Sequence, residues 1–436
     1  MEVLIERGEA WRQIAEHVLV PLCFKDATAA LDHPGVIMGL SKRLEFTTDT
    51  MAQAVTKHTL NMVRWLLANH PETCTPRAAD QAAAKGRLDV VRHLFANGQT
   101  CTPDAIDLAA AEGHQDVVEY LLAHGADCTS CAIDWAAADG HLGTLRCLLE
   151  AGKPCTTVAM DNAAARGHID VIRCLRSYDK WCTAGAIDRA ARGNHINVVL
   201  WLFANGATCT DVAMIMAAHR GHFSMVRLLM ANDAPYTTIV FDWVAAKGHL
   251  DMVRYLLAAG KKCTTAAIDQ AAARGHQDVV QLLLAAGKPC TAYAIDWAAA
   301  AGHGYTVRLL IEAGKPYASA AFDWAVGNGH MGVVQLIEKH LETPCCTIRA
   351  VKLAARKGHL DALRWLVAHG LRDRVCTWRT MDLAASKGHL HVVRWLAANG
   401  VPYTARGLDR TIQNGHPYVA CWLRVQGVRL MTHARS

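Results

Sequence analysis

Residues 263–290 of the chain read CTTAAIDQAAARGHQDVVQLLLAAGKPC, and close variants of this segment recur along most of the sequence. Each unit contains a Gly-His pair, such as Gly275-His276, and we use the Gly of that pair as the anchor of the unit. In one unit Asn replaces the Gly, and in the first clear unit Arg87 replaces the His. The anchors spaced 27 residues apart are Gly86, Gly113, Gly140, Gly167, Asn194, Gly221, Gly248, Gly275, Gly302 and Gly329. Gly358, Gly388 and Gly415 follow at steps of 29, 30 and 27, and weaker units lie around His58 and Asp32. A fixed period of about 20 to 50 residues predicts a stacked array.

Each unit is predicted to form two short helices. In the quoted segment, Thr264 is a good N-cap for the first helix, and Gly275 ends that helix in a left-handed conformation. The apolar run at residues 279–284 belongs to a second helix that ends at Gly287. The predicted buried stripe of the first helix is Ala267, Ile268, Ala271 and Ala272. A single unit cannot bury its apolar face alone, so neighbouring units should stack into one continuous core.

The pattern Ala-Ala-x-x-Gly-His followed by x-Leu-Leu-x-x-Gly, as at residues 271–276 and 282–287, resembles the ankyrin repeat. It recurs more than a dozen times over roughly residues 20–430. The ankyrin period is about 33 residues, and the missing residues fall where ankyrin repeats carry a β-hairpin. The Thr-Pro-Leu-His tetrad is also replaced, as by residues 266–269. We therefore expect an all-α, ankyrin-like helix-turn-helix solenoid with little or no β-hairpin. Such short-repeat arrays look like those of large amoeba-infecting DNA viruses and some protists.

The expected organisation has three parts. Residues 1–45 form a degenerate N-terminal cap segment, residues 46–426 form an array of about 14 repeats, and residues 427–436 form a C-terminal cap and tail. The irregular units contain two or three extra residues within 338–344 and 370–375, which are expected to form longer loops.

Three residue types recur at fixed places and form columns along the array. We expect each His after the anchor to bond the backbone of an adjacent turn, because neighbours about 9–10 Å apart cannot share a zinc ion. Cys twelve residues before the anchor is expected to be a half-buried filler, and the lone Cys128–Cys131 pair predicts no metal or redox site. Asp six residues before the anchor, interrupted by Ile215 and Lys352, predicts a stacking hydrogen bond to the hydroxyl or backbone of the next unit. The alternative is an acidic ridge for a basic partner.

A fourth column, five residues before the anchor, varies freely on the exposed side of the first helix. Trp and Arg are typical anchors of protein interfaces, and the resemblance implies that the first helices line a concave binding face. The candidate partner-binding residues from this column are Trp135, Arg189, Trp243, Trp297 and Trp324, joined by Lys247 and Arg274 from one position before the anchor. The alternative is that the indole rings only cover joints between alanine-rich helices.

Composition and charge narrow the classes of function. The 52% apolar content supports an extensive core, no apolar run is long enough for a membrane span, and residues 1–7 do not resemble a signal peptide. A net charge of +6 over 436 residues is mild, whereas a nucleic-acid binder would concentrate Lys and Arg in a stripe. Sixteen Cys residues without a secretory signal indicate reduced thiols, so we expect a cytoplasmic protein (in the host cytoplasm if the chain is viral).

Sequence motifs of enzymes are absent, including phosphate-binding glycine loops, nucleophile elbows and His-Glu-x-x-His. We therefore expect no enzymatic activity, no catalytic residues, no metal and no cofactor. The expected function is a monomeric scaffold that binds an unidentified protein partner along its concave face. One alternative is a substrate-recognition adaptor of a ubiquitin ligase that uses residues 1–45 to recruit the ligase. Another is a nucleic-acid binder, and no membrane association is expected.

Overall fold

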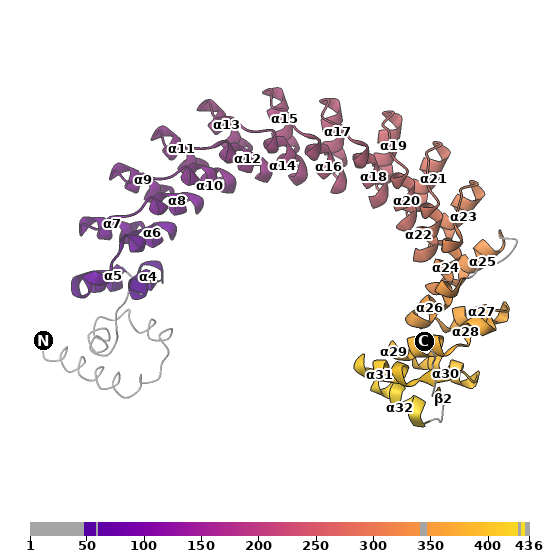
Figure 1. The fold of residues 1–436 in the computed structure, drawn as a ribbon. Helices are drawn as coiled ribbons and strands as arrows, with labels where there is room; N and C mark the ends of the chain where they lie inside the picture. Colours follow the sequence, from indigo (N-terminus) through magenta and orange to yellow (C-terminus); the bar gives the residue numbers. More distant parts are fainter. Residues whose placement is uncertain (1–47, 58–59, 341–346, 426–428, 432–436) are drawn as a thin grey trace, which may run out of the picture. The chain divides into compact units, whose positions relative to one another are not determined.

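A computed structural model describes residues 48–57, 60–340, 347–425 and 429–431. The described part contains 29 α-helices and one pairing of two very short strands (Figure 1), which confirms the all-α prediction. The first helices of the units are α4 (Thr48–Lys57), α6 (Pro76–Ala84), α8 (Asp104–Ala111), α10 (Cys131–Asp139), α12 (Thr157–Arg166), α14 (Gly185–Gly193), α16 (Asp211–His219), α18 (Thr238–Lys247), α20 (Ala266–Ala273), α22 (Tyr293–Ala301), α24 (Ser319–Gly327), α26 (Ile348–Lys357), α29 (Trp378–Ser386) and α31 (Ala405–Gln413).

Each first helix is followed by a second helix of similar length. The second helices are α5 (Leu60–Asn69), α7 (Leu88–Ala96), α9 (Gln115–Ala123), α11 (Leu142–Glu150), α13 (Ile169–Ser177), α15 (Ile196–Ala204), α17 (Phe223–Ala231), α19 (Leu250–Ala258), α21 (Gln277–Ala285), α23 (Gly304–Glu312), α25 (Met331–Glu338), α27 (Leu360–Ala368), α30 (Leu390–Ala398) and α32 (Pro417–Val425). The weak unit around His58 is thus a helix pair, α4 and α5, whereas the one around Asp32 lies outside the described residues. None of the described helices is long and apolar enough to cross a bilayer.

The chain divides into two compact units. In the described residues, one ends at Ala217 and also includes Ser224–Pro235, and the other comprises Ala218–Phe223 and the chain from Tyr236 onward. Within each unit, successive first helices pack on one another, as α10 packs on α8 and α12. Successive second helices do the same, as α21 packs on α19 and α23 (Figure 1). The predicted stripe is fully buried, with zero exposure at Ala267, Ile268, Ala271 and Ala272. Small side chains on the first helices allow this close stacking.

The Gly-His pairs join successive turns. Gly275 has a φ of +75°, and a Cβ at this position would lie 2.6 Å from the imidazole Nδ1 of His303 in the next unit. Glycine is therefore needed for its backbone conformation and for the space that the ring occupies. The predicted contact between imidazole and backbone is confirmed: the Nε2 atoms of His141 and His330 each lie 3.1 Å from a carbonyl oxygen of the preceding unit.

The Asp column forms a repeated structure that we call the Asp–Thr bridge. In the unit of Asp269, one carboxylate oxygen accepts from the Thr291 amide at 2.9 Å, and the other accepts from the Thr291 hydroxyl at 2.8 Å. That hydroxyl accepts in turn from the amide of Tyr293, so it also caps the next first helix. The other complete bridges join Asp80 to Thr102, Asp107 to Thr129, Asp134 to Thr156, Asp161 to Thr183, Asp188 to Thr210, Asp242 to Thr264, Asp323 to Thr347 and Asp382 to Thr404. The predicted stacking hydrogen bond is confirmed.

Two units lack the acidic partner of the bridge. Where Ile215 occupies the Asp position, the hydroxyl of Thr237 is buried and has no hydrogen-bond partner among the described residues. Where Lys352 occupies it, the hydroxyl of Thr377 instead lies 3.0 Å from that of Thr380 and accepts from the Thr380 amide.

The array ends in a short strand pairing. Strand β1 (Tyr403–Thr404) runs parallel to β2 (Leu430–Met431), and the Tyr403 amide donates to the carbonyl of Arg429. The expected loop at 370–375 is instead largely a helical turn, α28 (Arg372–Val375), in which Val375 is buried. The insertion therefore contributes an apolar side chain to the core. A short 3₁₀ helix, η1 (Pro71–Thr73), lies between α5 and α6. Residues 341–344 of the other expected loop, 338–344, lie outside the described residues.

Candidate functional site

The exposed face of the first helices carries large apolar side chains at two positions one helical turn apart. These positions lie nine and five residues before the anchor, so both point away from the buried stripe. The exposed apolar residues at these two positions are Leu108, Trp135, Val158, Val212, Ile239, Trp243, Tyr293 and Trp297. Sequence analysis found the second position but missed the first, which i,i+4 spacing from each Trp would have indicated.

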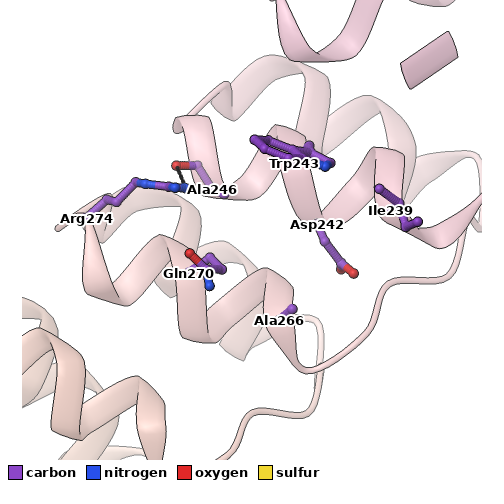
Figure 2. Close-up of a pocket in the computed structure, with 7 residues that line it drawn as sticks. All are labelled: Ile239, Asp242, Trp243, Ala246, Ala266, Gln270 and Arg274. Atoms are coloured by element: carbon purple, nitrogen blue, oxygen red, sulfur yellow. Dashed lines mark hydrogen bonds between the residues drawn. The ribbon is translucent and has the colours of Figure 1, made fainter. Parts of the chain in front are cut away.

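Trp243 borders a hollow on this face. It and Ile239 come from α18, Gln270 comes from α20, and Arg274 directly follows α20. Together with Asp242, Ala246 and Ala266 they surround a hollow of about 260 Å³, which we call the Trp243 hollow (Figure 2). The structure thus brings together two of the predicted residues, Trp243 and Arg274, across adjacent units.

The side chains around the Trp243 hollow are held in place. A guanidinium nitrogen of Arg274 donates to the carbonyl oxygen of Ala246 at 2.9 Å, drawn as the dashed line in Figure 2. The indole of Trp243 meets the ring of His219 edge to face, with centroids 5.0 Å apart. Asp242 is engaged in its bridge to Thr264 at 3.0 and 2.6 Å, so its carboxylate serves the stacking of the helices. The hollow is therefore preorganised, with an apolar wall and a fixed cation at its rim.

Trp297 forms a separate aromatic surface on α22. Its ring stacks on Tyr293 with centroids 5.2 Å apart and planes 15° apart, and the exposed fractions of the two side chains are 39% and 58%. Tyr293 was not among the predicted residues. The pair offers one flat aromatic surface, which could pack against a partner side chain.

Two of the predicted residues are placed differently from expectation. Trp324 on α24 is half-buried, because the guanidinium of Arg349 from α26 lies over its ring, 5.1 Å from the centroid. The expected exposure of the column is therefore wrong at this position. Lys247 is exposed at the end of α18 but does not line the Trp243 hollow.

The remaining predicted residues belong to the other compact unit. Trp135 on α10 has an exposed fraction of 42%. Arg189 on α14 is exposed, and its guanidinium donates to the side-chain oxygen of Asn162 on α12 at 2.9 Å. The column of Trp135, Asn162 and Arg189 thus runs along successive first helices of that unit, as the period predicts.

The cysteine column is a set of protected thiols. The thiols in the described residues are free, and most of them are half-buried. Burial raises the pKa of Cys182 and of Cys209 to about 11, so both are protonated near neutral pH. In the described part of the chain, no three His, Cys, Asp or Glu side chains come together as a set of metal ligands.

Comparison with known protein families identifies ankyrin repeats along most of the described chain. The family described as "Ankyrin repeats (3 copies)" matches residues 50–132, 189–267, 213–294 and 243–320. The family "Ankyrin repeats (many copies)" matches residues 133–176 and 351–397. No curated protein matches the chain in sequence.

Solved structures with some similarity include two repeat proteins. The human ASB11 ankyrin repeat domain is 21% identical, with 36% of this chain and 84% of that chain covered and a TM-score of 0.33. The pentatricopeptide repeat protein PPR10 in complex with an 18-nt psaJ RNA element is 12% identical, with 98% of this chain and 76% of that chain covered and a TM-score of 0.40. Another structure, of PPR10 from maize, is 9% identical, with 98% of this chain and 83% of that chain covered and a TM-score of 0.32. The repeated family matches, together with the helix pairs and the regular spacing of the repeats, show that the chain belongs to the ankyrin-repeat family.

Proposed function

We propose that this protein is a non-enzymatic scaffold that binds a partner protein on the exposed face of its first helices, with the Trp243 hollow as the principal anchor point. Ankyrin repeats generally serve as scaffolds for protein interactions, which supports the class of function. The single observation that carries the location is the partly exposed indole of Trp243 beside a hollow that already has a fixed cation.

The size of the hollow and the chemistry of its rim suit an apolar partner side chain. The exposed fraction of Trp243 is 38%, which corresponds to roughly 90 Å² of a Trp side chain. Covering that area would contribute about 2 kcal/mol to binding, which is typical of one interface hot spot. Arg274 can donate a further hydrogen bond to the partner, since only one of its donors is used by Ala246.

The proposed location of the protein is the cytoplasm. The cysteine column supports this, because free thiols such as Cys182 are typical of a reducing compartment, where disulfides rarely form. The proposal that the chain is not an enzyme rests on its family and on the first-helix face, where polar groups are spread along a row rather than gathered in one enclosed cavity.

Site-specific photocrosslinking tests the binding site. A benzoylphenylalanine placed at Gln270, inside the Trp243 hollow, should crosslink a partner protein in cells that produce the chain. The same probe at Arg308, which is exposed on the second helix α23, serves as the matched control. The crosslinked species are then identified by mass spectrometry.

The Trp243→Ala variant decides whether the hollow is the anchor. We expect this substitution to weaken the Gln270 crosslink by about tenfold or more, because it removes the exposed ring without touching the core. Crosslinks from Arg308 but not from Gln270, or a Gln270 crosslink that persists at full yield in Trp243→Ala, would refute the proposed site.

A further inference from the structure

The positive charge of the chain is concentrated near its C-terminal end. Residues 348–436 contain 15 of the 45 Lys and Arg residues but only four of the 39 acidic residues, which gives this segment a net charge of +11. Residues 1–347 contain 30 basic and 35 acidic residues, a net charge of −5. The mild value of +6 is therefore the sum over two regions of opposite sign.

The structure gathers part of this charge on one face. Helices α26, α28, α29 and α31 contribute Lys352, Arg374, Arg379, Arg406 and Arg410, which we call the basic surface. These five side chains are exposed. Among the described residues, no carboxylate lies within ion-pair distance of Lys352, Arg379, Arg406 or Arg410. Like charges that lie close together create a positive potential that attracts an anionic partner.

Lys352 interrupts the Asp column in this part of the array. It stands at the position where most other units have the Asp of the Asp–Thr bridge. Its substitution costs the unit one bridge, and Thr377 turns to Thr380 instead. At this position the array therefore has a cation on the basic surface in place of an Asp–Thr bridge.

Two hollows adjoin at Lys352. The first, of about 480 Å³, is lined on its apolar side by Ile348, Val351 and Trp378 and on its charged side by Lys352, Arg374 and Arg379. The second, of about 280 Å³, shares Lys352, Trp378 and Arg379 with the first and adds Arg406 and Arg410. The carboxylate in the second hollow, Asp382, is already occupied by Thr404, which donates to it from its amide at 3.0 Å and from its hydroxyl at 2.5 Å. Asp382 keeps its negative charge and interacts with Arg410, but the four cations around this hollow, Lys352, Arg379, Arg406 and Arg410, outnumber the one carboxylate.

We propose that the basic surface binds an acidic peptide segment of a partner protein, with one apolar side chain in the first hollow and carboxylates against Lys352, Arg379 and Arg406. Arg guanidinium groups bind carboxylates in a bidentate manner, which favours such a segment. The apolar wall formed by Ile348, Val351 and Trp378 has a natural counterpart in a peptide side chain. In contrast, a nucleic acid would need open aromatic faces for its bases, and Arg379 lies over the Trp378 ring, 5.1 Å from its centroid.

Fluorescence anisotropy with the full-length protein tests this inference. The probe is a short fluorescein-labelled peptide of glutamates with a central leucine and phenylalanine. The comparison probes are the same peptide with lysines in place of glutamates and a labelled single-stranded RNA of random sequence. We expect the acidic peptide to bind, with an affinity that falls as salt rises, and the basic peptide not to bind.

Lys352→Asp is the decisive variant, because it restores the Asp of the column opposite Thr377. We expect the affinity for the acidic peptide to fall by about tenfold or more while the melting temperature stays the same or rises. The double variant Arg379→Gln/Arg406→Gln, which changes exposed side chains only, should weaken binding similarly. Arg77→Gln is the matched control, since Arg77 is exposed at the equivalent helix position of α6 and should leave binding unchanged.

Unchanged affinity in Lys352→Asp and in the double variant would overturn the proposal. So would RNA that binds more tightly than the acidic peptide and depends on the same residues, because the surface would then serve nucleic acid. This inference and the proposed function use different helices, so the Trp243→Ala crosslinking experiment can fail or succeed independently of it.

Discussion

Removing one Asp–Thr bridge should lower the local stability of the array, and the Asp269→Ala variant tests this directly. Asp269 is only 5% exposed, and its two carboxylate oxygens accept from the amide and the hydroxyl of Thr291 at 2.9 and 2.8 Å. The substitution removes both bonds and leaves the Thr291 amide and hydroxyl without that acceptor at a half-buried site.

The expected loss is about 2 kcal/mol. A hydrogen bond to a charged group contributes about 1.5–3 kcal/mol, and two are lost here. Burial raises the pKa of Asp269, which shows that the buried charge has its own desolvation cost and offsets part of that gain. Ala also has a better helix propensity than Asp by roughly 0.5 kcal/mol. These offsets reduce the net effect to about the contribution of one bond.

Hydrogen exchange measured by mass spectrometry is the appropriate assay, because repeat arrays need not unfold in one cooperative step. Peptides that cover α20 and α22 should exchange about 30-fold faster in Asp269→Ala, the equivalent of about 2 kcal/mol. Gln270→Ala, at the next position of the same helix, is the control. Thr291→Ala and the double variant complete a double-mutant cycle. Equal exchange in Asp269→Ala and Gln270→Ala would refute a stabilising role for the bridge.

Three further outcomes are expected. Gly275→Ala should lower the melting temperature more than Gly287→Ala, although both glycines have a positive φ. A Cβ at Gly275 would lie 2.6 Å from a histidine ring, whereas no atom lies within 4 Å of a Cβ at Gly287. Equal melting temperatures of the two variants would contradict this. Burial lowers the pKa of His276 below its unfolded value, so the unfolded state binds more protons below about pH 6.5 and stability should fall on acidification from about pH 7.5 to 5.5. In His276→Gln the thermal scans should show a smaller drop, and an identical drop would be evidence against this account. Iodoacetamide at about pH 8 should label the exposed Cys421 well before Cys182, whose pKa is about 11; peptide mapping that finds the reverse order would show that the column is not protected.

The charge distribution can be predicted from the sequence. A count of charges per repeat locates the positive C-terminal region without any coordinates, whereas the net charge of the whole chain does not. The interruption at Lys352 was visible in the sequence as well. The position of Lys352 in two adjoining hollows was not visible in the sequence, because those hollows form only when the neighbouring helices pack together.

The repeat spacing alone determined the helix pairs, the buried alanine stripes and the stacking hydrogen bonds of residues such as Asp269, because a fixed period places equivalent residues against one another in every unit. Which tryptophans stay open was decided only by tertiary structure. Trp324 is covered by Arg349, whereas Trp243 borders a hollow whose other side is formed by Gln270 and Arg274. In each case the exposure of a ring depends on the side chains of the adjacent helix. The period places those side chains opposite the ring, but their length and conformation set whether they cover it.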